Sequence, residues 1–387
     1  MSGITFSRRV FAIAGATIVL AGCQVVPKTT TAPPAPTPAP TAGPTEEVLP
    51  EDETRHRVAL LVPMSGENAP VGQTLANATT MALLDTNASN LRITTYDTAS
   101  GAAEAARRAV ADGNKLILGP LIRENVGVVA DIARSRDVPV ITFSNDAAVA
   151  GGNVFVMGHV PEQSIERSVR YADANGANSF AAIIPDGDYG ERAEAAFETS
   201  VRGVGGNIVA EEDYQRNNTS IVSAAQRVAQ AGGFDALLIA EGPRLAARAA
   251  NEIAGRGTPT QIIGTELWSG EAGIAQTRSL DGAIFSAVSD ARYQTFANAY
   301  EARFGNAPYR IGRLGYDAVL LTLRISNDWR VGRDFPTSML RQDGGFIGVD
   351  GPFRFGRSGV AERALEVRKI ENGRVTIVSP APTKFDD

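Results

Sequence analysis

The feature that most constrains the fold is an alternation of short apolar segments with segments of helical periodicity, which begins at Arg57. The apolar segments are rich in β-branched residues and end in Pro, Gly or Asp, which is typical of strands. Strands that alternate with helices of about 10–15 residues indicate βαβ units and a parallel sheet with helices on both faces. The predicted strands are RVALLVPMSG, LRITTYD, KLILGPL and VPVITFS, separated by the helices PVGQTLANATTMALLDTN, GAAEAARRAVADG and ENVGVVADIARSRD.

The same alternation recurs from Ser179 to Ser289 and predicts a second α/β sheet. A long helical stretch follows, and then two alternating strands around Asn372 and Gly373. An Asn-Gly pair between such strands is a strong signal for a two-residue hairpin. Because about 330 residues exceed one ordinary hydrophobic core, the expected fold is α/β with two Rossmann-like lobes.

Two lobes of this kind place a ligand crevice at the carboxyl ends of their parallel strands. The loops expected there span residues 63–69, 119–125, 144–146, 185–189, 240–243 and 265–268. Polar and aromatic side chains in these loops are the candidates for ligand contacts. The candidates are Ser65, Arg123, Glu124, Asn125, Ser144, Asn145, Asp146, Tyr189, Glu241, Glu266 and Trp268.

Several loop residues also have a purely structural interpretation. Trp268 either stacks on a ligand, anchors a partner, or is half covered by the following helix. Arg123 either pairs with an anionic group in the cleft or remains a solvated side chain beside Glu124. Asp188 is expected to cap the helix that follows it rather than to contact a ligand.

Composition and motifs exclude several classes of function. The formal net charge of −6 disfavours electrostatic binding of nucleic acid. The single cysteine, Cys23, excludes an internal disulfide, and with only His56 and His159 there is no histidine/cysteine metal site to propose. No nucleophile, metalloprotease, P-loop or dinucleotide motif stands in a convincing context, so neither an enzyme nor a cofactor is expected.

The first 22 residues have the features of an export signal. Arg8 and Arg9 supply positive charge, and the apolar segment from Val10 to Ala21 is too short to span a membrane as a helix. The sequence SRRVF also resembles a twin-arginine signal, which leaves the export route open. Residues 23–56 are rich in Pro, Thr and Ala, so they are expected to form a disordered, extended tether.

The LAGC sequence that ends at Cys23 resembles the lipobox of bacterial lipoproteins. This resemblance implies that Cys23 becomes the mature N-terminus and carries lipid, with a plain secretory signal as the alternative. Gln24 follows the cysteine where an aspartate would be an inner-membrane signal, and the resemblance to proteobacterial sorting signals therefore favours the outer membrane. The protein is expected in the periplasm, anchored through Cys23.

The folded part resembles type I periplasmic binding proteins, most closely the leucine/isoleucine/valine-binding kind. Five segments carry this resemblance in the family's order: VALLVPMSGENAPVGQTLANATTMAL, LILGPL, VPVITFSNDA, IIPDGDYGERAEAAF and TFANAYEARFGNAPYRIGRLGYDAVLL. The resemblance implies three crossings between the lobes, near Gly158, Ala287 and Val349. His159 would lie at the first crossing, where packing is favoured over metal binding. Lobe 1 would comprise residues 57–158 and 287–348 and lobe 2 residues 159–286 and 349–380, followed by a tail, 381–387.

The resemblance supports two functions. In amino-acid-binding members a glutamate in lobe 2 holds the ligand ammonium, and Glu266 stands at that position. Arg123, Glu124 and Asn125 replace the family's hydroxyl residues, and Asp146 would repel a ligand carboxylate. GPLIRENV instead resembles the penicillin-binding-protein activators, outer-membrane lipoproteins that stimulate a class A penicillin-binding protein, a bifunctional peptidoglycan synthase. The sequence therefore favours a non-catalytic regulator of peptidoglycan synthesis. The alternative is an ABC-transporter receptor for branched-chain or other amino acids.

Overall fold

The computed structural model describes residues 54–216, 219–254, 260–271, 273–382 and 385. The predicted signal peptide (1–22) and residues 23–53 of the predicted tether, Cys23 included, lie outside the described residues. No helix in the described part of the chain combines the length and the apolar character needed to cross a bilayer.

The first sheet has five parallel strands in the order β2-β1-β3-β4-β5. The strands are β1 (His56–Val62), β2 (Leu91–Asp97), β3 (Leu116–Leu118), β4 (Val140–Thr142) and β5 (Val154–Val156), and the helices that accompany them are α1 (Ala69–Asp85), α2 (Ala102–Ala111), η1 (Arg123–Asn125), α3 (Val126–Arg134), η2 (Ala147–Val149) and, later in the chain, α9 (Gly312–Ser326). Side chains on β1 alternate between the two faces, as expected for a strand covered on both sides. Leu60 belongs to the core that contains α9, whereas Leu61 belongs to the core that contains α2 and α3.

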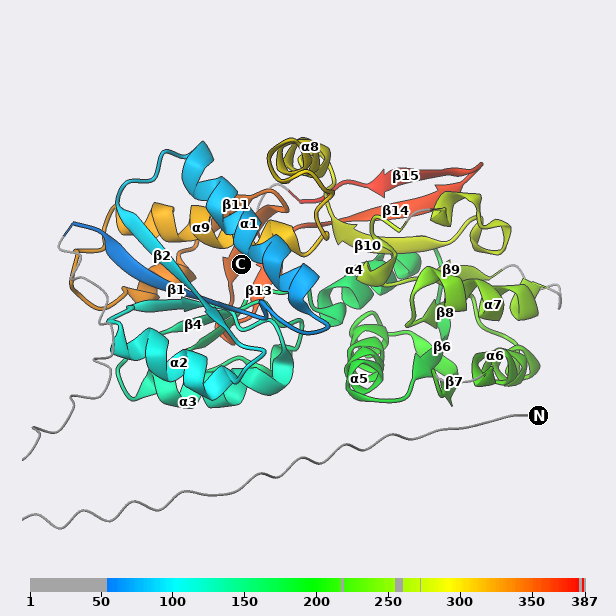
Figure 1. Cartoon of the computed structure of the whole chain (residues 1–387). Helices are drawn as coiled ribbons and strands as arrows, with labels where there is room; N and C mark the ends of the chain where they lie inside the picture. Colours follow the sequence, from blue (N-terminus) through cyan, green and yellow to red (C-terminus); the bar gives the residue numbers. More distant parts are fainter. Residues whose placement is uncertain (1–53, 217–218, 255–259, 272, 383–384, 386–387) are drawn as a thin grey trace, which may run out of the picture. The chain divides into compact units, whose positions relative to one another are not determined.

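The second sheet has seven strands in the order β15-β14-β10-β9-β8-β6-β7. Its strands are β6 (Ser179–Pro185), β7 (Asn207–Tyr214), β8 (Ala236–Ile239), β9 (Gln261–Ile263), β10 (Ile284–Val288), β14 (Leu365–Glu371) and β15 (Arg374–Ser379), and its helices are α4 (Pro161–Ala174), α5 (Asp188–Gly203), α6 (Ser220–Ala231), α7 (Pro243–Ala254), η3 (Glu266–Trp268), η4 (Ile274–Gln276) and η5 (Arg278–Leu280). β6 to β10 run parallel, and β14 and β15 are antiparallel additions. α4 and α5 cover one face, and α6 and α7 cover the other (Figure 1).

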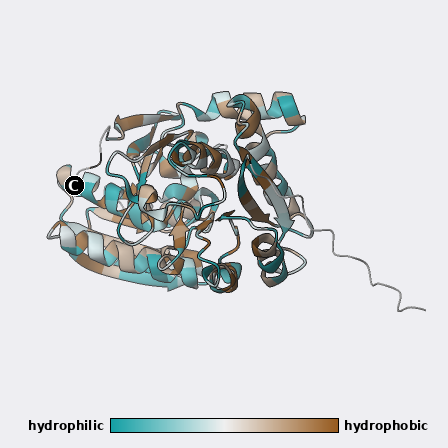
Figure 2. Cartoon of the chain, turned by 90° about the vertical axis from the view of Figure 1, so that its left-hand side faces the viewer, coloured by the Kyte–Doolittle hydropathy of each residue, from teal (hydrophilic) through white to brown (hydrophobic). Residues whose placement is uncertain are grey.

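These two sheets confirm the predicted α/β fold with two parallel-sheet lobes. The predicted hairpin is also present, because Glu371 pairs with Arg374 across a two-residue turn. Asn372 and Gly373 both have positive φ, 52° and 73°, which is the geometry an Asn-Gly turn favours. In Figure 2 the helices carry hydrophilic and hydrophobic residues side by side, as expected for helices that cover a sheet.

A small third sheet changes the predicted division of the lobes. It consists of β11 (Phe346–Gly348), β12 (Gly351–Phe355) and β13 (Ala361–Arg363), and it follows α8 (Tyr293–Phe304) and η6 (Thr337–Arg341). Phe353 and Phe355 of β12 are buried in the same core as Leu60 of the first sheet. The chain therefore stays with lobe 1 until β13 and joins the seven-stranded sheet only at Leu365, later than the crossing expected near Val349. We call the first sheet with α8, α9 and β11–β13 lobe 1, and the seven-stranded sheet with its helices lobe 2.

Candidate ligand-binding site

A cavity of about 430 Å³ lies between residues of the two lobes. This volume is within the range of about 300–1,000 Å³ that small-molecule sites occupy. Its walls combine apolar side chains with a few charged ones, which is the usual composition of such a site. The residues that line it are Leu121, Phe143, Asn145, His159, Val160, Gln163, Ser164, Glu266, Leu267, Ser269, Glu271, Ala287, Val288, Arg310, Ile311, Arg313, Leu314, Arg363 and Leu365.

Each lobe contributes a different part of the wall. Lobe 1 provides Leu121 and Phe143, which follow β3 and β4, and Ile311 and Leu314 at the start of α9. Lobe 2 provides η3 and the surface around the start of α4 and the end of β10. The loops after parallel strands thus reach the cavity from both sheets, as the predicted fold requires.

Glu266 is a carboxylate of the cavity wall that is largely shielded from solvent. The Tyr189 hydroxyl donates to its Oε1 at 3.2 Å and also lies 3.0 Å from Thr265 Oγ1. Its Oε2 is buried and has no hydrogen-bond partner among the described residues. Burial raises the pKa of Glu266 to about 7, so near neutral pH a cationic group would convert it fully to the charged form.

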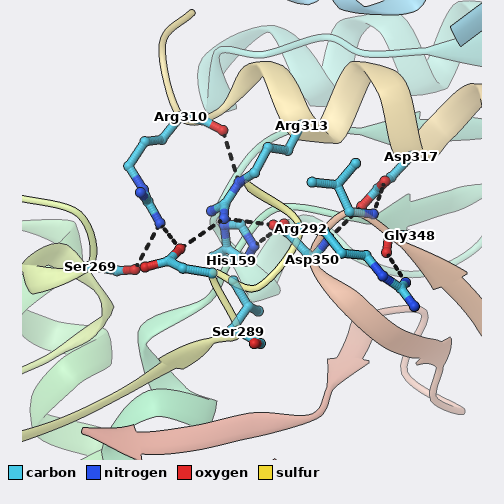
Figure 3. A network of polar contacts seen from close by, with 12 residues as sticks. His159, Ser269, Ser289, Arg292, Arg310, Arg313, Asp317, Gly348 and Asp350 are labelled. Atoms are coloured by element: carbon cyan, nitrogen blue, oxygen red, sulfur yellow. Dashed lines mark hydrogen bonds and ion pairs between the residues drawn. The ribbon is translucent and has the colours of Figure 1, made fainter. Parts of the chain in front are cut away.

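A buried ion network lies where the chain passes between the lobes (Figure 3). Asp350 Oδ2 contacts His159 Nε2 at 2.7 Å, and Asp350 Oδ1 lies 2.8 Å from Arg313 Nη1. Arg363 Nη1 lies 3.6 Å from Asp350 Oδ2. Burial opposes ionisation of Asp350, but Arg313 and His159 hold its pKa well below the usual range. Burial lowers the pKa of His159 to about 4, so the histidine is neutral at pH 7.

Asp317 of α9 is a second buried carboxylate beside this network. Burial, with Asp350 nearby, raises its pKa to about 7. Its Oδ1 accepts a hydrogen bond of 2.6 Å from the Val349 backbone N–H. A Cβ at Gly348 would lie 2.3 Å from Asp317 Cγ. The close approach of β11 to α9 therefore depends on glycine at that position.

Asp290, after β10, joins the network to the cavity rim. Arg310 and Arg368 both donate to its carboxylate, Arg368 Nη1 at 2.6 Å. Arg310 Nη2 also donates to Ser269 Oγ of lobe 2 at 3.2 Å, and Figure 3 shows this side chain extending from the chain before α9. The Arg310 guanidinium lies 4.2 Å from the centre of the Tyr293 ring, within cation–π distance.

Two of the predicted ligand residues line the cavity, and three others make contacts beside it. Asn145 and Glu266 are part of the wall, and Tyr189 orients Glu266. Arg123 donates both to Asp146 of its own lobe and to Asp188 of lobe 2. Asp146 is therefore neutralised by Arg123 and does not stand as a free negative charge beside a ligand. Asp188 is the first residue of α5, where Gly187 is the N-cap, and its carboxylate accepts from Arg123.

The remaining predicted residues are not among those that line this cavity. Ser65 donates to Asp97, and Ser144 accepts from the Asp146 backbone N–H. Glu124 and Asn125 lie in η1, outside the cavity wall. Glu241 pairs with Arg216 and accepts a hydrogen bond from Tyr214. Trp268 is fully buried, with its Nε1 donating to the Glu241 carbonyl at 2.7 Å, so it packs in the core of lobe 2.

The sequence reasoning missed the basic residues of the site. Arg310 and Arg313 come from the loop before α9 and its first turn, and Arg363 comes from β13. Arg313 belongs to a segment that predicts an amphipathic helix, where an arginine is usually exposed to solvent. Arg363 belongs to a segment that the sequence places in lobe 2, whereas β13 packs in lobe 1. One sequence signal does point to Arg313: it is a charged residue within the apolar part of a predicted helix, beside Leu314, where a charge must find a partner.

A family model described as periplasmic binding protein matches residues 56–374. The chain belongs to the periplasmic binding protein family. Its members are non-catalytic binding proteins of the periplasm, and the match spans both lobes.

Solved structures of this family are similar in fold over most of the chain. One is a putative branched-chain amino acid ABC transporter protein of Rhodospirillum rubrum, with a TM-score of 0.72 and 20% identity, covering 84% of this chain and 100% of that one. Another is a leucine-binding protein of Thermotoga maritima, with a TM-score of 0.63 and 21% identity, covering 84% and 98%. A third, from Rhodopseudomonas palustris, was solved with 3,4-dihydroxybenzoic acid, with a TM-score of 0.63 and 21% identity, covering 86% and 98%.

Curated relatives match over shorter segments. An uncharacterized protein of Rickettsia prowazekii is 27% identical over 180 residues, which is 46% of this chain and 48% of the relative. The penicillin-binding protein activator LpoA of Vibrio antiquarius is 26% identical over 163 residues, which is 40% of this chain and 27% of that protein. The chain thus spans half or less of the length of these relatives.

Proposed function

We propose that this protein is a receptor that binds an amino-acid-type ligand in the cavity between its lobes. The observation that carries the proposal is Glu266, a cavity carboxylate with one buried oxygen that has no hydrogen-bond partner among the described residues. A ligand ammonium would supply that partner and a compensating charge. Leu121, Phe143, Ile311 and Leu314 would pack against an apolar side chain.

The names of structural relatives support this choice of ligand. Proteins of this fold from Thermotoga maritima and Desulfitobacterium hafniense are, respectively, named for leucine and solved with it. Leucine also suits the present cavity, because its side chain is apolar and branched and its amine would face Glu266. Delivery of the bound amino acid to an ABC transporter is the role that this proposal implies.

Thermal unfolding of the full chain with each natural amino acid tests the proposal. A ligand present at about one hundred times its dissociation constant stabilises the protein by about 2.7 kcal/mol, which raises the midpoint by several degrees. We expect the largest rise with leucine or another branched amino acid, and none for Glu266→Gln at the same concentration. If no amino acid raises the unfolding midpoint, the proposal is wrong.

A second candidate, activation of a peptidoglycan synthase, is favoured by the match with LpoA. In this case a surface of the protein, rather than the cavity, would contact a class A penicillin-binding protein. The direct test is glycan-strand synthesis by a purified enzyme of that class with and without this protein. Stimulation of synthesis together with no stabilisation by any amino acid would favour the activator over the receptor.

Both candidates include a lipid anchor at Cys23, most simply in the outer membrane. The proposal rests on the LAGC sequence and on Gln24 after the cysteine. Metabolic labelling with an alkyne fatty acid should label the wild-type protein and not Cys23→Ser. Recovery of the wild-type protein in the soluble periplasmic fraction, without label, would show that no anchor is attached.

A further inference from the structure

The basic residues of the cavity suggest a position for the negatively charged end of the ligand. Arg310, Arg313 and Arg363 line the cavity together with the carboxylates of Glu266 and Glu271. Arg310 is already committed, because it donates to Asp290 and to Ser269 and stacks on Tyr293. Arg313 and Arg363 have buried N–H donors without hydrogen-bond partners among the described residues, and they lie together at the crossing between the lobes.

Arg363 makes fewer hydrogen bonds than its guanidinium allows. Its Nη2 donates to the Met157 carbonyl at 2.6 Å, and its guanidinium lies 5.2 Å from the centre of the Phe353 ring. These contacts fix the side chain in place. Its Nε and Nη1 have no hydrogen-bond partner among the described residues, although the side chain is only 2% exposed. Donors of this kind are costly to bury unless an acceptor reaches them.

Arg313 is in a similar position. Its Nε donates to the Arg310 carbonyl at 3.1 Å. Its Nη1 lies 2.8 Å from Asp350 Oδ1, but the angles do not make a hydrogen bond. Two buried guanidinium groups thus share Asp350, while His159 is neutral at pH 7 because burial lowers its pKa. Arg313 Nη1 also lies 3.7 Å from Asp290 Oδ1, but that carboxylate already pairs with Arg310 and Arg368.

We infer that the carboxylate of the ligand binds to Arg313 and Arg363 while its ammonium faces Glu266. This inference rests on the proposed function and adds the residues that hold the carboxylate of the ligand. The two unused donors of Arg363, Nε and Nη1, lie on different edges of its guanidinium, so the carboxylate would accept one charge-assisted hydrogen bond from Arg363 and one from Arg313. The apolar side chain then lies against Phe143, Leu121 and the start of α9.

This site for the carboxylate differs from the one expected from the strand-end loops. Ser144 uses its hydroxyl within its own loop, and Arg123 is engaged with Asp146 and Asp188 at the edge of the lobes. Neither of these side chains is among those that line the cavity. The two arginines of the crossing take over the role that loop hydroxyls were expected to fill.

Calorimetric titration of the full chain with three related probes tests the inference. Leucine carries both charges, 4-methylpentanoate lacks the ammonium, and leucinamide lacks the carboxylate. For Arg363→Gln and Arg313→Gln we expect the affinity for leucine and 4-methylpentanoate to fall at least about 30-fold, as when one partner of a buried ion pair is removed. The affinity for leucinamide should stay within about threefold, because it has no carboxylate to lose a partner.

Glu266→Gln should show the opposite pattern, with lower affinity for leucine and leucinamide and little change for 4-methylpentanoate. Arg227→Gln is the control, because Arg227 pairs with Glu212 elsewhere on lobe 2 and does not line the cavity. Its affinities should match those of the wild type. If the glutamine variants unfold, Arg363→Lys, which keeps the charge and loses the planar fork, should weaken leucine and 4-methylpentanoate selectively.

The outcomes separate the two proposals. If leucine binds the wild type and both Arg313→Gln and Arg363→Gln equally well, the assignment of the carboxylate site is wrong while the receptor function stands. An equal loss for all three probes, or the same loss in Arg227→Gln, would also overturn the assignment. If none of the three probes binds the wild-type protein, both the receptor function and the inference are wrong.

Discussion

At the scale of single residues, the site and its surroundings hold the partly buried Glu266 and the fully buried Asp317 and Asp350, which differ in charge state. Glu266 and Asp317 have few compensating partners, so burial raises the pKa of each to about 7. Asp350 is fully buried, but the cationic Arg313 and Arg363 lie beside it and the neutral His159 hydrogen-bonds to it, which keeps it ionised. The number of cationic neighbours, rather than burial alone, decides which carboxylate carries charge.

The raised pKa of Glu266 gives a prediction for stability without ligand. A carboxyl group with a pKa of about 7 when folded, against an ordinary value of 4.5 when unfolded, stabilises the fold fully below pH 4.5, and that contribution is lost as the pH rises through 7. Glu266→Gln does not titrate. The melting temperature of this variant should therefore rise relative to wild type between pH 5 and pH 8. A constant difference over that range would show that the pKa of Glu266 is not raised.

At the scale of elements, the strands and helices of both lobes follow directly from their sequence patterns. Short runs such as LRITTYD form strands, and the Asn372-Gly373 turn joins β14 and β15 as its residue types require. Arg363 could not be placed in the same way, because β13 is a three-residue strand whose partner, β12, is recognisable only when Phe353 and Phe355 are seen packed in lobe 1. Local pattern gives the elements, whereas the site depends on long-range packing.

The β14–β15 turn gives a prediction at this scale. Gly373 has a φ of 73° and no atom within 4 Å of the position of a Cβ, so an alanine would be strained only through its backbone. Gly373→Ala should cost about 1–2 kcal/mol. Gly127 of α3 also has open space around it but lies within a helix, so Gly127→Ala should instead stabilise by about 0.4–1 kcal/mol. Urea unfolding measures the change in the free energy of unfolding for both variants. Equal changes would show that the positive φ of Gly373 is not the cause of the loss.

At the scale of the whole described part, polar contacts join the two lobes around the cavity. Arg123 of lobe 1 reaches Asp188 of lobe 2, and Arg310 reaches Ser269. Arg192 of lobe 2 donates to the Asn145 carbonyl of lobe 1 at 2.5 Å. Glu266 could be predicted as a site residue from its loop, but these bridges could not, since they depend on how the lobes face one another.

Removal of the Arg123 bridge should speed ligand release. Asp188→Asn loses the largely exposed ion pair to Arg123 and leaves the pair between Arg123 and Asp146 in place, so the effect is modest. We expect the dissociation rate of a bound amino acid to rise about two- to fivefold by stopped-flow measurement. Arg107→Gln, which removes an exposed pair within α2, is the control and should leave the rate unchanged. Equal rates for Asp188→Asn and wild type would mean that the bridge does not hold the lobes closed.

The central claim is that the cavity binds an amino acid through Glu266. Equilibrium dialysis of the full chain against radiolabelled leucine at pH 8, where Glu266 is ionised, tests it most directly. The account predicts that the wild type retains one leucine per chain and that Glu266→Gln retains almost none at the same concentration. Failure of the wild type to retain leucine, or equal retention by both proteins, would contradict it.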